Sequence, residues 1–282
     1  MFKQFKEAFK IANDCIILAI PLVLFMWLLS FYFAFSNSVG NIPGQMILAF
    51  ITVIFMSGAF LSGWFFMVQK AVDVSQRVYV LDADRAKDTI NLFKSIPSGI
   101  GKYFLSFIGM LLIFFFIVSL SGALVYWVGT SFIGQVFTQE QLASALSSTE
   151  DMKIFLDTLS MEQLVQLNLW NLLIMGVTTI LSFSCMLWIP EIIYCSANPL
   201  LALFRSIKKV FVGFKKSVFL FIYLSILNIV MSFLSSLAIQ HALLYLLIMV
   251  IYFYFIIYVA VLVFSYYERE YCITDNKNDE KV

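Results

Sequence analysis

Histidine is nearly absent from this chain of 282 residues, and charged side chains are few. With His241 as the only histidine, a histidine-based metal cluster or catalytic triad is excluded. Charged residues make up 12% of the chain, about half the share of a typical soluble domain, and 62% of the residues are apolar. A soluble enzyme is therefore excluded. We predict a protein that is not an enzyme and that uses no cofactor.

Cysteine is also scarce, and no two cysteines are spaced as a CxxC pair. The four are Cys15, Cys185, Cys195 and Cys272. We expect free thiols that behave as small apolar side chains. Net charge is likewise small, with 18 Lys and Arg against 17 Asp and Glu, which argues against nucleic acid as a partner.

Long intervals without charge predict the fold class, because an ionised side chain at mid-bilayer costs about 2.5 to 3.5 kcal/mol. A span needs about 20 residues, so the intervals hold an all-α membrane protein of six transmembrane helices. Residues 36–44 and the short segment Ala238–His241 supply the turns of two hairpins. The predicted spans are residues 15–35, 46–68, 103–128, 167–189, 217–237 and 242–267. We expect residues 1–282 to form one membrane domain.

Basic residues predict the orientation of these spans, because Lys and Arg accumulate on the cytoplasmic side. Seventeen of the 18 lie in the segments on one side, and Lys153 alone lies on the other. Both termini, including the tail 268–282, are thus predicted to be cytoplasmic, and the loop 129–166 to be outside. The first apolar segment is too long for a signal peptide, so we expect an uncleaved anchor.

A recurring pattern precedes three of the predicted hairpins. NLFKSI (91–96) stands before the third span, ALFRSIKK (202–209) stands before the fifth, and FKEAFKIA from Phe5 is a looser copy. The pattern predicts a basic amphipathic helix followed by a membrane hairpin, three times over. Within the second span, Gly58, Ser62 and Gly63 predict a face for close helix packing.

The third copy has the clearest amphipathic pattern, and Asn198 with Pro199 predicts its beginning. Its apolar face is predicted to hold Leu200, Phe204, Ile207, Phe211, Phe214 and Val218. Its basic flanks are predicted to hold Arg205, Lys208, Lys209, Lys215 and Lys216. Such a helix lies among lipid headgroups, with the basic side chains toward anionic lipid. It is either a lipid-sensing or partner-docking surface, or an ordinary interfacial helix whose lysines snorkel.

Glu191 is an acidic residue directly beside a span, after Trp188 and Pro190. Two interpretations are open. It pairs with Arg205 or the neighbouring lysines as part of the lipid- or partner-contacting set, or it is a solvated carboxylate at a helix end. We favour the solvated carboxylate.

The outer loop contains two capping-box patterns, TQEQ at Thr138 and SMEQ at Ser160. Each places a Ser or Thr three residues before a Gln and ahead of an apolar stretch. Both predict the beginning of a helix.

The segment MLWIPEIIYCSANPLLALFRSIKKVF, Met186–Phe211, resembles bacterial six-helix inner-membrane proteins related to the glycerophosphoryl diester phosphodiesterase membrane domain. The resemblance implies a fold and a location in the bacterial plasma membrane, with no activity attached. The acidic and histidine metal-binding set of the catalytic phosphodiesterase domain is absent from this sequence.

Two functions fit these features. The first is a structural, assembly or envelope-homeostasis role. Its partners would be the lipid bilayer, through anionic headgroups, and a protein in the membrane or cytoplasm. The alternative is the membrane subunit of a transporter for an apolar or lipid-like solute, working with a separate ATPase.

Overall fold

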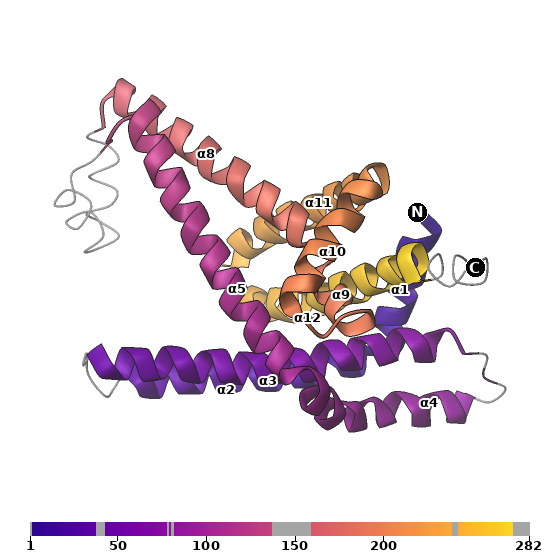
Figure 1. Cartoon of the computed structure of the whole chain (residues 1–282). Helices are drawn as coiled ribbons and strands as arrows, with labels where there is room; N and C mark the ends of the chain where they lie inside the picture. Colours follow the sequence, from indigo (N-terminus) through magenta and orange to yellow (C-terminus); the bar gives the residue numbers. More distant parts are fainter. Residues whose placement is uncertain are drawn as a thin grey trace. The chain divides into compact units, whose positions relative to one another are not determined.

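The computed structural model describes residues 2–37, 43–77, 79, 82–136, 159–238 and 242–272 (Figure 1). These residues are almost entirely helical and contain no strand, which confirms the all-α prediction. The helices are α1 (Phe2–Asp14), α2 (Ala19–Asn37), α3 (Pro43–Ser75), α4 (Asp82–Asn91), α5 (Ser95–Phe132), α8 (Met161–Cys185), α9 (Trp188–Tyr194), α10 (Pro199–Val212), α11 (Phe214–Ala238) and α12 (Ala242–Tyr267). Short turns of 3₁₀ helix, Ile16–Leu18 and Leu92–Lys94, precede α2 and α5, and a π-helical turn, Glu268–Cys272, follows α12.

Six helical stretches of the described residues are long and apolar enough to cross a membrane, as predicted, and indicate a multi-pass membrane protein. They are Ile16–Phe35, Ile47–Ser75, Asp84–Phe132, Met161–Tyr194, Phe214–Leu237 and Leu243–Cys272. The third and fourth stretches extend well beyond the predicted spans. An uncharged interval marks the part that hydrocarbon tolerates, whereas backbone hydrogen bonding continues the helix into charged residues.

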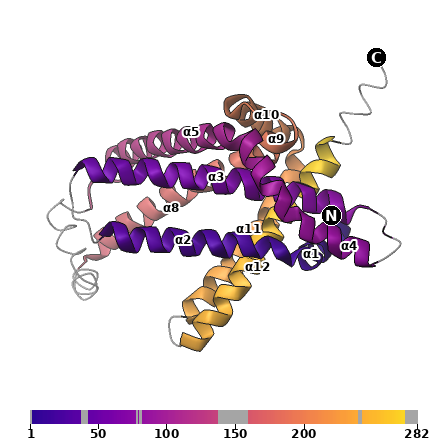
Figure 2. The ribbon, with the colours of Figure 1, turned by 90° about the horizontal axis from the view of Figure 1, so that it is seen from below.

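The chain divides into two compact units, residues 1–112 with 184–282 and residues 113–183. In the first unit, α12 contacts α1, α2, α3, α9 and α11. Figure 2 shows α2 beside α3 and α11 beside α12 as two hairpins. The second half of α12 forms much of the core, since Ile257, Val261 and Tyr267 are fully buried.

Close packing between α3 and α5 depends on small residues from both helices. A Cβ on Gly99 would lie 2.7 Å from the Phe66 Cβ and 2.9 Å from the Ser62 carbonyl oxygen. Gly63 approaches Ile96 equally closely, and Ser62 is fully buried. The predicted packing face of the second span is thus confirmed.

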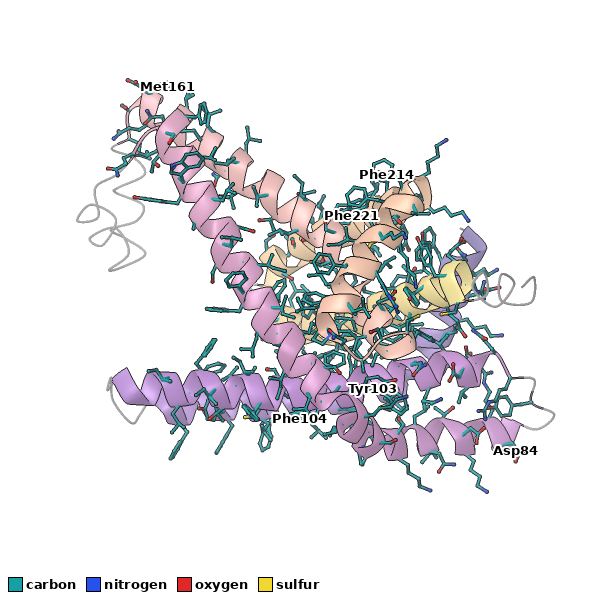
Figure 3. The ribbon with its side chains drawn as sticks, viewed as in Figure 1. Asp84, Tyr103, Phe104, Met161, Phe214 and Phe221 are labelled. Atoms are coloured by element: carbon teal, nitrogen blue, oxygen red, sulfur yellow. The ribbon has the colours of Figure 1, made fainter. Side chains whose placement is uncertain are left out.

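Successive residues of α5 lie on different sides of the helix (Figure 3). Tyr103 donates a hydrogen bond to the Ile193 carbonyl oxygen at 2.8 Å, whereas Phe104 meets Phe55 edge to face. The tyrosine side chain therefore joins α5 to α9, and the phenylalanine joins α5 to α3. Tyr103 and Ile193 both line the cavity described below.

The contacts of the second unit include the packing of a tryptophan on a glycine and a helix cap. Trp170 of α8 lies against Gly129 of α5, and its indole N–H donates to the Gly134 carbonyl at 3.2 Å. Ser160 and Gln163 exchange hydrogen bonds of 3.3 and 3.0 Å at the beginning of α8. This is the capping box predicted at Ser160, whereas the one at Thr138 and the tight turn at His241 lie outside the described residues.

Candidate functional site

A buried carboxylate lies in α9. Glu191 is 0% exposed, the Lys209 amine lies 2.9 Å from its Oε2, and the Tyr267 hydroxyl donates to the same oxygen. An ionised carboxylate inside a protein requires such partners, because unpaired burial costs several kcal/mol. The favoured prediction, a solvated helix-end carboxylate, is wrong. Because Glu191 is buried, it does not face a lipid or a partner protein, and the lysine that pairs with it lies 18 residues further along the chain.

The turn after α9 explains how Glu191 and Lys209 meet. Asn198 accepts from the backbone N–H groups of Leu200 and Leu201 at 3.1 and 3.3 Å, so it caps α10 with Pro199 in the first turn. The Trp188 indole donates to the Pro199 carbonyl at 2.9 Å. These bonds turn the chain sharply and return α10 over α9. The predicted cap at Asn198 is confirmed.

Lys209 connects α10 to the end of α12. Its amine donates to the Tyr267 hydroxyl at 2.6 Å and lies 4.8 Å from the centroid of that ring. The Tyr271 hydroxyl donates to the Lys209 carbonyl at 3.0 Å. A Cβ on Gly213 would lie 2.5 Å from this hydroxyl, so a larger residue there would displace the Tyr271 side chain. Three elements, α9, α10 and α12, thus meet at one ammonium group.

The buried face of α10 differs from the predicted apolar face. It consists of Ala202, Leu203, Ser206 and Val210. The larger predicted side chains, among them Leu200, Phe204 and Phe211, are more than half exposed. Small residues face the protein because they allow α10 to approach the neighbouring helices closely, and the bulky side chains point away from the protein.

The predicted basic residues separate into two groups. Lys209 is in the buried pair, and Lys216 pairs with Glu270. Arg205, Lys208 and Lys215 are exposed and form no ion pair with any other described residue. The structure therefore brings one predicted lysine to the predicted acid and leaves three cations on the surface.

Cys195 extends the cluster around Glu191 to the surface. This exposed thiol lies 3.2 Å from the Tyr267 hydroxyl and 3.8 Å from the Lys209 amine. The Cys272 thiol, the Tyr267 hydroxyl and the Lys209 charge lower the pKa of the Cys195 thiol to about 6, against burial and the Glu191 charge. All four cysteines are free, as expected, but Cys195 is exposed and lies beside a tyrosine hydroxyl instead of packing as a small apolar side chain. Its partner Tyr267 follows more than 70 residues later, so no local signal in the sequence indicates it.

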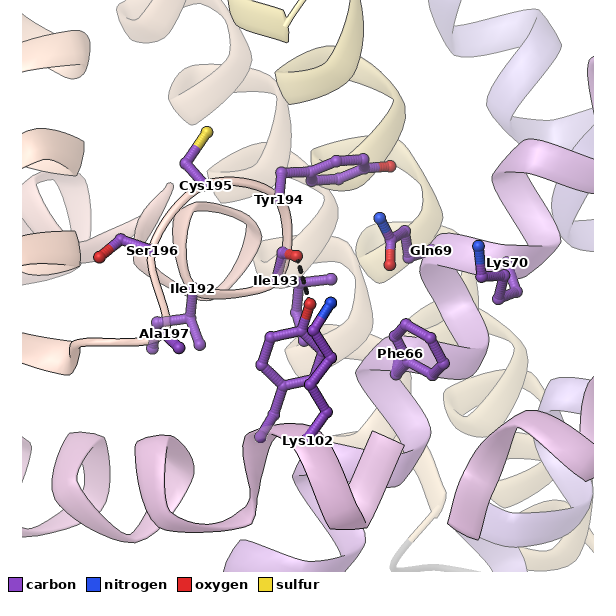
Figure 4. A pocket seen from close by; sticks show the side chains of 11 residues that line it. Phe66, Gln69, Lys70, Lys102, Ile192, Ile193, Tyr194, Cys195, Ser196 and Ala197 are labelled. Atoms are coloured by element: carbon purple, nitrogen blue, oxygen red, sulfur yellow. Dashed lines mark hydrogen bonds between the residues drawn. The ribbon is translucent and has the colours of Figure 1, made fainter. Parts of the chain in front are cut away.

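A cavity of about 340 Å³ adjoins this cluster (Figure 4). Its walls are formed by Phe66, Gln69, Lys70, Lys102, Tyr103 and residues 192–197. Lys70 pairs with Asp73 at 3.0 Å, and Lys102 lies 4.9 Å from the centroid of the Tyr103 ring. The Gln69 Oε1 and Tyr194 hydroxyl oxygens are buried without a hydrogen-bond partner among the described residues. Such a cavity admits a small polar molecule, and Figure 4 shows the Cys195 sulfur pointing away from Phe66 and Lys102.

The described residues hold no group of three or more His, Cys, Asp or Glu side chains that could bind a metal ion. The groups that the cluster presents are a carboxylate, an ammonium group, phenol hydroxyls and a thiol. No family model, curated protein or solved structure matches this chain.

Proposed function

We propose that this is a multi-pass protein of the bacterial plasma membrane, with both ends of the chain in the cytoplasm and a structural, assembly or envelope-homeostasis role without catalysis. Support comes from the six apolar helices and from the 17 basic residues on one side of the predicted spans. The relation to the glycerophosphoryl diester phosphodiesterase membrane domain belongs to this proposal.

One observation carries the proposal. α10 is fixed to α9 and α12 by the buried pair of Glu191 and Lys209, yet it exposes bulky apolar side chains together with Arg205 and Lys208. A helix with those two exposed faces suits the boundary between headgroups and acyl chains. Because the helix is fixed, its cations stay at one depth, where anionic headgroups meet them.

The number of exposed cations gives the expected size of the preference for anionic lipid. A Lys or Arg near an anionic membrane surface contributes about 1 kcal/mol, so three exposed cations favour anionic over neutral lipid by roughly a hundredfold. Lys209 and Lys216 contribute less, because their charges are already paired with Glu191 and Glu270.

The test compares lipids retained by two variants with equal charge changes. The first is Arg205→Gln/Lys208→Gln/Lys215→Gln, and the control is Lys6→Gln/Lys10→Gln/Lys87→Gln, which also removes three exposed charges. Each is purified in nanodiscs of mixed phosphatidylglycerol and phosphatidylcholine and released for native mass spectrometry. We expect the first variant to lose bound phosphatidylglycerol and the control to keep it. Equal retention would rule out Arg205 and Lys208 of α10, with Lys215 of α11, as the lipid-contacting cations.

The orientation has its own test. A cysteine introduced as Ser148→Cys should react with a membrane-impermeant maleimide in intact cells, whereas Lys277→Cys should react only after permeabilisation. The opposite pattern would reverse the proposed topology and place α10 on the outer side.

A further inference from the structure

Two lysines from different helices line the 340 Å³ cavity of the first unit. Lys70 lies near the end of α3 and Lys102 near the beginning of α5. The described lining of the cavity contains no Asp or Glu, and among the described residues Lys102 forms no ion pair. Two ammonium groups without an acid between them give the cavity a positive potential, which attracts an anion.

The same two lysines mark the ends of uncharged segments. Lys70 is the first charged residue after Asp14, and Lys102 is the last one before the uncharged stretch that begins at Tyr103. A charged side chain at the end of an apolar membrane helix lies at the level of the lipid headgroups, since hydrocarbon excludes it. Both ammonium groups therefore line one cavity at the depth of lipid phosphates, where basic pockets between membrane helices bind headgroups.

Aromatic rings hold the two ammonium groups in place. The Lys70 amine lies 5.6 Å from the centroid of the Phe66 ring, and the Lys102 amine lies 4.9 Å from that of Tyr103. The two rings are themselves 5.8 Å apart. The dashed line in Figure 4 marks the hydrogen bond that fixes the Tyr103 hydroxyl to the Ile193 carbonyl. Because these rings are packed in the wall, the amines lose less freedom when they bind an anion.

The wall also carries hydrogen-bond donors in excess of acceptors. An ammonium group has three donors, and the Asp73 Oδ2 accepts from Lys70 at 3.0 Å. The Gln69 Oε1 and the Tyr194 hydroxyl are buried without a hydrogen-bond partner among the described residues, so the Gln69 amide and the Tyr194 hydroxyl keep their donors. A phosphate group is made of acceptor oxygens and matches such a wall, because charge-assisted hydrogen bonds are the strong ones.

We propose that this cavity binds one anionic phosphate ester, with Lys70 and Lys102 on its oxygens and Phe66 and Ile192 along its carbon skeleton. The depth of the two lysines favours the headgroup of an anionic phospholipid as the source, and a free glycerol phosphate carries the same group. The inference goes beyond the proposed function. That function uses exposed cations of α10 and α11, whereas this site lies between α3, α5 and the α9–α10 turn.

The first test measures the acetylation rate of individual lysines in the full, unmodified chain. The protein is held in phosphatidylcholine nanodiscs, treated with sulfosuccinimidyl acetate and digested for peptide mass spectrometry. Dioctanoyl phosphatidylglycerol should slow the acetylation of Lys70 and Lys102 several-fold and leave the exposed Lys94 unchanged. Dioctanoyl phosphatidylcholine should protect neither lysine of the cavity. Equal protection of all three lysines, or of none, would overturn the proposal.

Glycerol 1-phosphate separates the two sources of the phosphate ester. Protection of Lys102 by glycerol 1-phosphate as strong as that by the lipid would make the ligand a soluble phosphate ester. Protection by the lipid alone would make it a headgroup. Both results support the phosphate site, whereas the absence of protection by both probes would contradict it.

A pair of variants with equal charge changes tests the two lysines directly. Lys70→Gln/Lys102→Gln should weaken the binding of dioctanoyl phosphatidylglycerol roughly tenfold, because one free and one partly paired cation are removed. The control, Lys87→Gln/Lys94→Gln, removes two exposed cations outside the cavity and should bind as the native chain does. Native mass spectrometry from phosphatidylcholine nanodiscs measures the affinity. Equal affinities of the two variants would contradict the site.

The cations of α10 and α11 serve as a separate comparison. Arg205→Gln/Lys208→Gln/Lys215→Gln should keep the protection of Lys70 and Lys102, because none of these residues lines the cavity. Failure of the lipid-contacting cations and failure of the phosphate site are thus observed in different variants. Loss of the protection in this variant would show that general surface charge, and not the cavity, attracts the lipid.

Discussion

Two cavities of the same volume, about 340 Å³, lie in the two units of the chain and differ in chemistry. The lining of the cavity in the first unit includes Lys70, Lys102, Gln69 and Cys195. The cavity of the second unit, between α5 and α8, is mostly apolar and is lined by Val118, Ser121, Gly122, Val125, Tyr126, Trp170, Ile174, Val177, Thr178 and Leu181. Lining chemistry, rather than size, separates a site that favours polar ligands from a groove that fits an apolar chain.

The two units also differ in the interactions that stabilise them. All six ion pairs among the described residues belong to the first unit. In the second unit, the contacts described are the packing of Trp170 on Gly129 and the cap at Ser160. Removing a charged side chain should therefore destabilise the first unit most. Changing the size of a packed side chain or removing a helix cap should destabilise the second unit.

The largest effect is expected at the buried ion pair. Lys209→Ala leaves Glu191 charged and buried without its cation, which costs about 3 to 5 kcal/mol of unfolding free energy. Lys208→Ala, an exposed neighbour, should change it by less than about 0.5 kcal/mol. Thermal unfolding in detergent, followed by tryptophan fluorescence, measures both. Equal stability of the two variants would mean that the pair contributes nothing.

Packing between α3 and α5 should give the next largest effect. Gly99→Ala places a Cβ against the backbone of α3, which cannot rotate away, so we expect a loss of about 2 to 3 kcal/mol. Gly101→Ala, on the same helix with nothing within 4 Å, is the control and should be neutral or slightly stabilising. The difference in melting temperature between the two variants is the measurement, and no difference would contradict the close approach.

A smaller loss of unfolding free energy is expected from a glycine-to-alanine substitution in the second unit. Gly129→Ala meets the Trp170 ring at 2.1 Å, and this side chain can shift, so the cost should be about 1 to 2 kcal/mol. Gly122→Ala has open space and serves as control. Adding Trp170→Leu to Gly129→Ala should recover part of the loss. A double variant less stable than Gly129→Ala would show that relief of the clash does not offset the lost indole contacts.

The smallest effect should come from the cap of α8. Ser160→Ala removes the hydroxyl that accepts from the Gln163 N–H and should cost about 1 kcal/mol, whereas Ser160→Asp keeps an acceptor there. Hydrogen exchange in the first turn of α8 should quicken in the alanine variant alone. Equal exchange in both variants would rule out a role for the cap.

The sequence predicts the helices and their caps well, because both depend on local signals. Uncharged intervals identify six spans, since ionised side chains are expelled from hydrocarbon. Asn198 and Ser160 are recognisable as caps because their side chains bond to backbone groups two or three residues away. Where a helix ends beyond the membrane is less predictable, because charged residues outside hydrocarbon do not interrupt it.

The candidate site was only partly predictable. Pairing of Glu191 with a nearby lysine was among the interpretations, yet burial depends on how α10 returns over α9. The contact of Cys195 with Tyr267 forms only because α12 packs beside α9. The buried face of α10 was also missed, because small residues such as Ala202 and Ser206 carry little hydrophobic signal.

The central claim is that the pair of Glu191 and Lys209 fixes α10 to the rest of the first unit, and a double-mutant cycle tests it most directly. Glu191→Met and Lys209→Met are measured singly and together by thermal unfolding in nanodiscs. If the two side chains interact as described, the double variant loses far less stability than the sum of the single losses, because neither charge is left buried alone. Losses that simply add would contradict the claim.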